Sequence, residues 1–483
     1  MGLIPEDALA RRSAAQAAAT QRSSDPAAWI ALSRACQVLV DEKGALAAAR
    51  RAFELQPDNV DAIRQLAIVL FQLGPIDFEA RPLLERLLAL APGDPTALRY
   101  LYHFAMLDED HRQAIDLLKT LDRLHPGDPI TAGWIARSYQ LMGDPLTASE
   151  RYARAAARCE NELYPFPYYG PWGGIKPVLT ALAGHAPASE QLSVQLCQEA
   201  GLGVADLSNP RYPNDSAASI LRLQDRVARR DLFIFGNGPS LEDITSRAHD
   251  VASLDFASMA MSSFQIVDED LLRPIGKRLE LACLTHLTML KYQDRAIRDW
   301  FATVPSAILM LPLWLRDYAA LTGEPDFLLG RADQLFWFDC FSETMPPVPS
   351  DPLHFPGVNT LMCALGVGVL ARPRRIFLFG FDGQIRGRDS QRSGALYYRE
   401  DHEGYHATVR NEPEARRLTK ACLRWNTLNF NDLAPVVLRH AALLFDLPSP
   451  PIYNVSADSA LTPFPRLTFA RFREIVSSKA VRQ

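Results

Sequence analysis

The strongest constraint on the fold is a repeat in the first third of the 483-residue chain. Three segments there resemble one another: FELQPDNVDAI (53–63), LALAPGDPTAL (88–98) and DRLHPGDPITA (122–132). Their prolines, Pro57, Pro92 and Pro126, follow one another at steps of 35 and 34 residues. A unit of this size cannot bury its apolar face alone, so three or four units must stack into an array.

Two helical patterns lie between successive prolines, as in WIALSRACQVLVDEKGALAAARRAFEL (29–55). A period of about 34 residues, with two antiparallel helices and a closing proline, is typical of tetratricopeptide repeats. We therefore predict a tetratricopeptide domain over residues 1–158. Its groove suits a peptide or a protein, and the alternatives are a generic helical bundle, a spacer or a dimerisation arm.

The second half of the chain shows a different pattern. After a connector at 159–228, which contains the proline- and aromatic-rich YPFPYYGPWGG (164–174), short apolar runs alternate with helical ones. The runs occupy 231–236, 255–260, 279–285, 306–313, 335–340, 374–382 and 442–447. Runs that are apolar on both faces suit a parallel sheet buried between helices. The pattern predicts a doubly wound, Rossmann-like α/β domain over 229–476.

Composition excludes several classes of protein. The net charge of -5 and the pI near 6.1 give no nucleic-acid footprint. Seven scattered cysteines without a C-x-x-C pair argue against a disulfide framework and for a reducing compartment. The first 20 residues lack the apolar core expected of a signal peptide, and no run of about 18 uncharged apolar residues occurs. We therefore expect a cytoplasmic protein.

The first apolar run leads into GNGPSLEDI (236–244), which has the character of a phosphate-binding turn. Gly236 and Gly238 permit a tight turn and a close approach to the backbone. Pro239 stiffens the turn, and Ser240 is a good N-cap for a following helix. The free amides of a helix N-terminus attract phosphate, and Asn237 adds a donor and an acceptor. A purely structural strand-to-helix turn is the alternative.

A second motif, DHEGYHATV (401–409), contains a literal H-E-x-x-H. That pattern binds zinc when a helix places both histidines on one face. Here Gly404 interrupts the pattern at a helix cost of about 1 kcal/mol, and no third ligand follows at the usual spacings. The sequence therefore favours another use for His402 and His406, and we predict no metal site.

Four blocks in order give a family resemblance over about 229–476. They are GNGPSL, then FPGVNTLMCALGVGVLARPRRIFLFGFDGQ (355–384), then the paired histidines with the helix behind them, then IYNVSADSAL (452–461). Together they resemble the bacterial sialyltransferases of glycosyltransferase family 42 and the related motility-associated (Maf) flagellin glycosyltransferases. The resemblance implies a Rossmann-like domain of the GT-A-variant, sialyltransferase-like kind that holds a CMP-linked sugar.

The resemblance also implies roles for single residues. His406 is the expected base, while Asp382 orients the site, touches the acceptor or only caps its strand. The expected donor-binding residues are Gly236, Asn237, Gly238, Pro239, Ser240, Gly357, Gly380, Gln384, Tyr397, Tyr398, Asn454 and Ser456. The sequence departs from the family where Gln384 stands near a phosphate-binding tyrosine position. It departs again at Ser258 and Thr285, where middle strands of the family end in asparagine.

The predicted activity is an inverting, metal-independent transfer of a sialic, pseudaminic or legionaminic acid from its CMP-sugar to a protein such as flagellin. The repeats would bind that acceptor, and no cofactor besides the CMP-sugar substrate is expected. The alternatives are transfer to lipopolysaccharide or capsule glycans, and a non-catalytic repeat scaffold with a nucleotide-binding module. A pterin pyrophosphokinase is a further alternative, but it would need acidic magnesium ligands that the sequence does not reveal.

Overall fold

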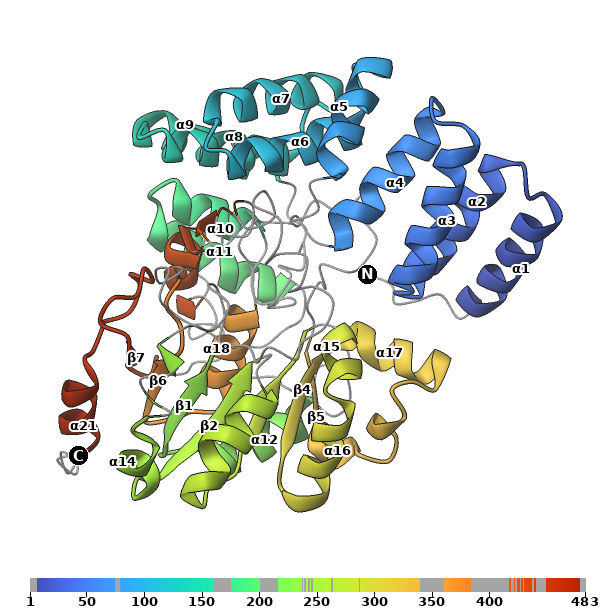
Figure 1. The fold of residues 1–483 in the computed structure, drawn as a ribbon. Coiled ribbons are helices and arrows are strands. Elements are labelled where there is room, and N and C mark those ends of the chain that lie inside the picture. Colours follow the sequence, from blue (N-terminus) through green and yellow to red (C-terminus); the bar gives the residue numbers. More distant parts are fainter. Residues whose placement is uncertain are drawn as a thin grey trace.

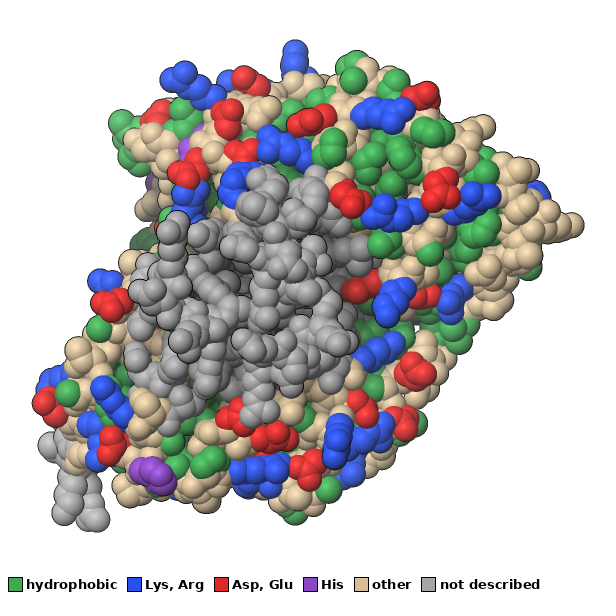
Figure 2. All heavy atoms as spheres, in the orientation of Figure 1, with side chains coloured by type: hydrophobic (Ala, Val, Ile, Leu, Met, Phe, Trp, Pro, Cys, Tyr) green, Lys and Arg blue, Asp and Glu red, His purple; other side chains and the backbone are tan. Residues whose placement is uncertain are grey.

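A computed structural model describes residues 7–73, 79–159, 175–199, 216–338, 360–383 and 417–477, with short gaps inside the fourth and last ranges. The N-terminal array and the α/β domain lie against each other (Figure 1). On the face drawn in Figure 2, the Lys and Arg side chains alternate with Asp and Glu over the described surface. Among the described helices, none has both the length and the apolar character needed to cross a bilayer.

The N-terminal half is a stack of antiparallel helix pairs. Its helices are α1 (Ala8–Gln21), α2 (Pro26–Val38), α3 (Glu42–Leu55), α4 (Val60–Leu73), α5 (Ala80–Leu90), α6 (Pro95–Leu107), α7 (His111–Leu124), α8 (Pro129–Leu141), α9 (Pro145–Arg158), α10 (Ile175–Leu182) and α11 (Ala186–Glu199). Pro57, Pro92 and Pro126 each follow the end of a helix by two residues. The predicted helical repeat is therefore confirmed.

Aspartates start many of these helices. The side chain of Asp94 accepts a hydrogen bond from the Ala97 N–H at 2.8 Å, and Asp110 accepts one from Gln113 at 3.0 Å. Asp144 caps α9 in the same way through Thr147. Each cap satisfies an N–H that the first helical turn leaves without a partner. The proline that ends one helix and the aspartate that starts the next thus set the repeat unit.

The C-terminal half is built on a seven-stranded parallel sheet in the order β5-β4-β3-β2-β1-β6-β7. The strands are β1 (Asp231–Phe235), β2 (Phe256–Met261), β3 (Leu281–Cys283), β4 (Ile308–Pro312), β5 (Leu335–Phe338), β6 (Arg375–Phe379) and β7 (Ile452–Asn454). Every described residue of β1 and β2 is buried, as expected for a sheet covered on both faces. An α/β domain follows the helical repeats, as predicted.

Alternate side chains of β1 enter two different cores. Leu232 and Ile234 belong to the cluster that includes α12 (Ser216–Val227) and α18 (Thr360–Leu370). Phe233 and Phe235 belong to the cluster on the other face. That second cluster includes residues of α14 (Ala248–Ala252), α16 (Asp294–Thr303), α17 (Leu313–Thr322) and α21 (Phe469–Ser477). The sheet is therefore covered by helices on both sides.

Two boundaries differ from the sequence-based prediction. Helix α12, predicted as part of the connector, packs on the sheet and donates from Gln224 Nε2 to the Leu370 carbonyl at 2.9 Å. The described seventh strand is β7, in a segment that the sequence assigned only to donor binding. With three residues, β7 is too short to give a periodic signal. The strand predicted at 442–447 lies outside the described residues.

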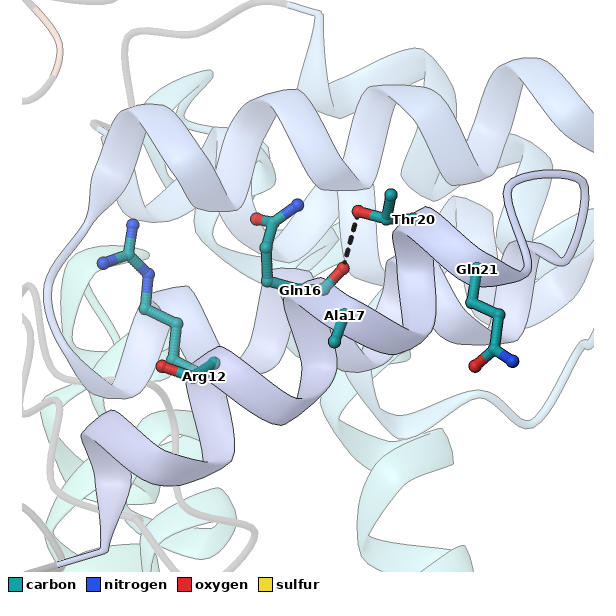
Figure 3. Close-up of a pocket in the computed structure, with 6 residues that line it drawn as sticks. Arg12, Gln16, Ala17, Thr20 and Gln21 are labelled. Atoms are coloured by element: carbon teal, nitrogen blue, oxygen red, sulfur yellow. Dashed lines mark hydrogen bonds between the residues drawn. The ribbon is translucent and has the colours of Figure 1, made fainter.

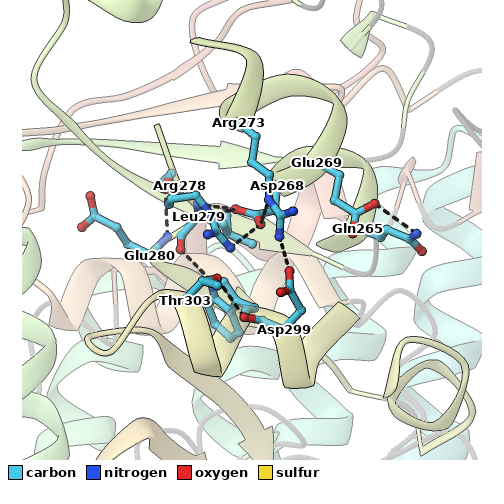
Figure 4. Close-up of polar contacts among 11 residues, drawn as sticks. Gln265, Asp268, Glu269, Arg273, Arg278, Leu279, Glu280, Asp299 and Thr303 are labelled. Carbon is cyan, nitrogen blue, oxygen red and sulfur yellow. Dashed lines mark hydrogen bonds and ion pairs between the residues drawn. The ribbon is translucent and has the colours of Figure 1, made fainter. Parts of the chain in front are cut away.

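Buried aspartates anchor the amino ends of two strands. Asp231, at the start of β1, is fully buried and accepts hydrogen bonds from Arg374 and Arg375. Figure 4 shows the second centre, where Asp268 accepts from Arg273, Arg278 and the Leu279 N–H just before β3. Both lie at the edge of the sheet where parallel strands begin, so we assign them to stability.

Candidate functional site

The strand order places three chain segments at one edge of the sheet. The chain adds β2 to β5 on one side of β1, and β6 and β7 lie on the other side. This reversal puts the carboxyl ends of β1 and β6 side by side, the place where ligands bind in open α/β sheets. Gly236–Ser240 follows β1, Gly380–Gly383 follows β6, and Val455 begins the segment after β7. Three of the four motif blocks therefore meet at this edge.

Asp382 joins these three segments. Its side chain is 2 % exposed, and its Oδ2 accepts a hydrogen bond from the Ser240 N–H at 2.8 Å. Its Oδ1 accepts from Ser456 Oγ at 2.7 Å, and its carbonyl accepts from the Ala460 N–H at 2.7 Å. Hydrogen bonds to a carboxylate are stronger than neutral ones. This geometry favours the strand-end cap among the roles that the sequence left open for Asp382.

The glycines of the first loop make room for the chain itself. The Gly236 and Gly238 N–H groups donate to the Phe379 and Gly380 carbonyls, both at 2.7 Å. A Cβ added at Gly238 would lie 2.5 Å from the Gly380 carbonyl oxygen, where no side chain fits. The prediction that these amides are free for a phosphate is therefore wrong for Gly236, Gly238 and Ser240. The reason is that the last residue of β6 and the loop after it already accept hydrogen bonds from these three N–H groups.

Two buried polar atoms of this edge have no hydrogen-bond partner among the described residues. Asn454 is fully buried, and its Nδ2 donates to the Phe381 carbonyl and to Ser459 Oγ, each at 2.9 Å. Within the part of the chain that the structure describes, its Oδ1 and the Oγ of Ser240, which is 1 % exposed, are buried without a hydrogen-bond partner. An unsatisfied buried polar atom costs about 1–3 kcal/mol. These two atoms are therefore unsatisfied groups of the folded chain at this edge of the sheet.

Seven predicted site residues fall within the described part of the chain, and the structure brings them to one edge: Gly236, Gly238, Ser240, Gly380, Asp382, Asn454 and Ser456. The others lie outside the described residues: Asn237, Pro239, Gly357, Gln384, Tyr397, Tyr398 and His406, together with His402. The base and the two tyrosines therefore stay predictions. Among the described residues, no group of three or more His, Cys, Asp or Glu side chains is arranged to hold a metal ion.

Sequence reasoning missed several residues of this edge. Ser459 Oγ donates to the Phe381 carbonyl at 2.6 Å and accepts from the Leu461 N–H. Thr427 Oγ1 donates to the Gly383 carbonyl at 2.8 Å. Thr285, at a position where the family ends a strand in asparagine, has its hydroxyl 2.9 Å from that of Thr360. Hydroxyl groups are common on every surface, so only Ser459, inside a motif block, carried a usable signal.

A hollow elsewhere on the molecule is a poor candidate for the site. It lies on α1, is about 690 Å³ in volume and is lined by Arg12, Ser13, Gln16, Ala17, Thr20 and Gln21 (Figure 3). The hydroxyl of Thr20 donates to the Gln16 carbonyl within the helix, and Arg12 is paired with Asp41. One exposed helix face supplies the whole lining, so no groups from different elements converge there.

Replacing Gly238 by alanine is expected to lower the free energy of unfolding by about 1–3 kcal/mol, the usual cost of overpacking. The new methyl group must displace the end of β6, because the Gly380 carbonyl is backbone and cannot move aside. Urea unfolding measures the loss. Gly93→Ala is the matched control, since its Cβ would meet only Leu124 at 3.5 Å. Equal stability of the two variants would contradict the close approach of β1 and β6.

Comparison with known proteins finds only distant similarity to solved structures. No protein-family model matches the chain, and no curated protein matches it. Among solved structures, the MamA protein is 14% identical and matches 36% of this chain and 93% of its own, with a TM-score of 0.30. YrrB, a TPR protein with an unusual peptide-binding site, is 15% identical over 38% of this chain and 93% of its own, with a TM-score of 0.30. A Thermobaculum terrenum O-GlcNAc transferase mutant is 14% identical over 74% of this chain and 69% of its own, with a TM-score of 0.22. Similarity at this level says nothing about activity.

Proposed function

We propose that the protein is a glycosyltransferase that moves a nonulosonic acid from a CMP-linked donor to a protein acceptor. The observation that carries the proposal is the meeting of the loops after β1, β6 and β7 at the carboxyl edge of the sheet. These loops contain GNGPS, G-x-D and YNVS, three of the blocks on which the family resemblance rests. Parallel α/β sheets bind nucleotides at this edge.

The donor would bind over this edge of the sheet. Asn454 Oδ1 and Ser240 Oγ are buried beneath this edge, so they would reach a nucleoside or a sugar only after the loops shift. Asp382 holds the three loops in register through Ser240 and Ser456 and acts as a positioning residue. Because the Ser240 amide is already bonded to that carboxylate, we assign the phosphate to other donors, with Tyr397 and Tyr398 the candidates from the resemblance.

The chemistry requires a leaving phosphate and a deprotonated acceptor. The anomeric carbon gains oxocarbenium character as the CMP phosphate departs, and hydrogen-bond donors stabilise the charge on that phosphate. A histidine titrates near neutral pH and suits the removal of the acceptor proton, the role we propose for His406. Direct attack by the acceptor hydroxyl inverts the anomeric centre. The proposed reaction uses no metal ion.

The acceptor would be a protein such as flagellin, bound by the repeat array. In Figure 1, α6 and α8 lie on the side of the array that faces the α/β domain. Arg137 on α8 is already paired with Asp432 of the C-terminal half. We therefore assign the acceptor to the other end of the array, which contains α2 and α4. Lipopolysaccharide or capsule glycans are the second acceptor class.

Incubation with CMP-linked sialic, pseudaminic and legionaminic acids tests the proposal by the release of CMP. Turnover of at least one donor is expected, and His406→Ala should lower the rate about a hundredfold or more, the usual contribution of a general base. His402→Ala is the matched control and should retain most activity. If no donor releases CMP, the proposed glycosyltransferase activity is wrong. If His406→Ala remains active, only the assignment of His406 as the general base is wrong.

One observation favours a second candidate, a repeat scaffold with a nucleotide-binding module that does no chemistry. The N–H groups of Gly236, Gly238 and Ser240 are bonded within the chain, so the loop offers a phosphate fewer amides than its sequence predicts. Calorimetric titration with CMP separates the candidates when combined with the turnover assay. Tight binding of CMP without turnover of any CMP-sugar supports the scaffold.

A further inference from the structure

A helical segment of the C-terminal half lies between the repeat array and the loops of the candidate site. The described residues from Arg417 to Arg439 are helical, and we call them the bridging segment. Its residues Trp425, Phe430, Leu433, Ala434 and Leu438 belong to the same apolar cluster as the array residues Tyr102 and Trp134. The bridging segment is therefore packed into the core that the two halves share.

Ion pairs join the bridging segment to the array. Arg137 on α8 is paired with Asp432, and its guanidinium lies 5.8 Å from the centre of the Trp425 ring. The Arg137 side chain is 7% exposed and that of Asp432 is 36% exposed, so the arginine is shielded from solvent while the carboxylate is partly exposed. The turn between α6 and α7 supplies two more carboxylates. Asp108 accepts from Arg417 at 2.6 Å, and Glu109 is paired with Arg424.

Hydrogen bonds join the bridging segment to the site on another side. Thr427 Oγ1 donates to the Gly383 carbonyl, one residue beyond Asp382. Asn431 Nδ2 donates to the Ala460 carbonyl at 3.0 Å, and Asn431 Oδ1 accepts from the Thr462 N–H at 3.0 Å. Ala460 in turn donates its N–H to the Asp382 carbonyl. Thr427 and Asn431 thus contact the loops after β6 and β7 at the point where Asp382 joins them.

We propose that Thr427 and Asn431 are positioning residues, through which the repeat array fixes the loops around Asp382. Three contacts mark the path, with the chain itself joining one to the next. They are the pair of Glu109 with Arg424, the hydrogen bond of Thr427 to Gly383, and that of Ser240 to Asp382. Packed, hydrogen-bonded elements of this kind carry coupling between distant sites. Its importance for sugar transfer rests on the proposed function, but the physical link between array and loops does not.

Hydrogen–deuterium exchange in the full-length protein without nucleotide tests the link. The Ser240 and Ala460 amides report it, because both donate to Asp382. Arg424→Glu sets two carboxylates against each other at Glu109 and should speed exchange of both amides about fivefold, the scale of about 1 kcal/mol for an exposed pair. The swap Glu109→Arg with Arg424→Glu should restore the rates to within about twofold.

Asp122→Arg is the matched control, because it breaks the Arg158–Asp122 pair inside the array, 2.9 Å in length, without touching the bridging segment. It should leave both amides unchanged. Thr427→Val keeps the side-chain shape and removes the hydrogen bond to Gly383, so it should speed exchange of both amides as Arg424→Glu does. This variant therefore tests the link even if Arg424→Glu does not fold. Faster exchange in the bridging segment alone, with Ser240 and Ala460 unchanged, overturns the proposal. A lack of CMP turnover bears only on the proposed function.

Discussion

Replacing Asp231 by alanine is expected to lower the free energy of unfolding by about 3–5 kcal/mol, the usual cost of removing one partner from a buried ion pair. The carboxylate is fully buried and accepts two hydrogen bonds from Arg374, at 2.9 and 2.7 Å, and two from Arg375, at 2.9 and 2.6 Å. Without it, the Arg375 guanidinium, whose side chain is only 13% exposed, stays in the interior without its counter-charge. Urea unfolding followed by circular dichroism measures the loss.

The same carboxylate predicts a pH dependence. Burial raises the pKa of Asp231, but the hydrogen bonds and charges of Arg374 and Arg375 outweigh burial and hold that pKa below its ordinary value. A lowered folded-state pKa means that the stabilisation is complete above the unfolded pKa of about 4 and is lost as the pH falls through the folded pKa. The difference in stability between wild type and Asp231→Ala should therefore shrink below about pH 4.

Asp255→Ala is the matched control, since this carboxylate also meets an arginine, Arg230, but is 84% exposed. Exposed pairs contribute about 0–1 kcal/mol, so this variant should unfold close to wild type. A loss below about 1 kcal/mol in Asp231→Ala would contradict the assignment of Asp231 to stability. If the difference in stability between wild type and Asp231→Ala stays constant down to pH 2.5, the proposal that Asp231 is ionised in the folded protein is wrong.

Replacing Asp382 by alanine is expected to cost about 3 kcal/mol, because the variant loses two hydrogen bonds to a charged acceptor and leaves both donors buried. The donors are the Ser240 N–H, at 2.8 Å, and Ser456 Oγ, at 2.7 Å. Ser456→Ala removes only one of these bonds and should cost about 1–2 kcal/mol. Urea unfolding orders the variants, and exchange of the Ser240 amide should rise in Asp382→Ala but much less in Ser456→Ala.

Asp382→Asn keeps the shape of the side chain and at least one hydrogen-bond acceptor. Its free energy of unfolding should therefore lie between those of wild type and Asp382→Ala. This series separates the positioning role from a catalytic one. In the CMP-release assay, a positioning residue gives activity losses that follow the loosening of the Ser240 amide. An inactive Asp382→Asn variant with wild-type exchange at Ser240 would instead assign Asp382 to the chemistry.

The sequence could bring two of its motifs to one edge of the sheet because both stand at the ends of predicted strands. GNGPS begins at the end of the apolar run at 231–236, and G-x-D ends the run at 374–382, so parallel pairing alone places both at one edge. Their contacts were beyond reach of the sequence. Asp382 and Ser240 are 142 residues apart, and the hydrogen bond between them depends on β6 lying beside β1. Because β6 lies beside β1, the loop Gly236–Ser240 is a turn whose described amides are bonded within the chain, and not the phosphate-binding turn that its sequence predicted.

The repeat array and the covered sheet were determined by the sequence itself, since proline spacing, aspartate caps and apolar runs act over a few residues along the chain. The tertiary structure decided the pairing of β1 with β6, the packing of α12 on the sheet and the ion pair between Arg137 and Asp432. Each of these joins residues more than 100 positions apart. Such partners are chosen by which faces pack together after the elements form, and no local pattern records that choice.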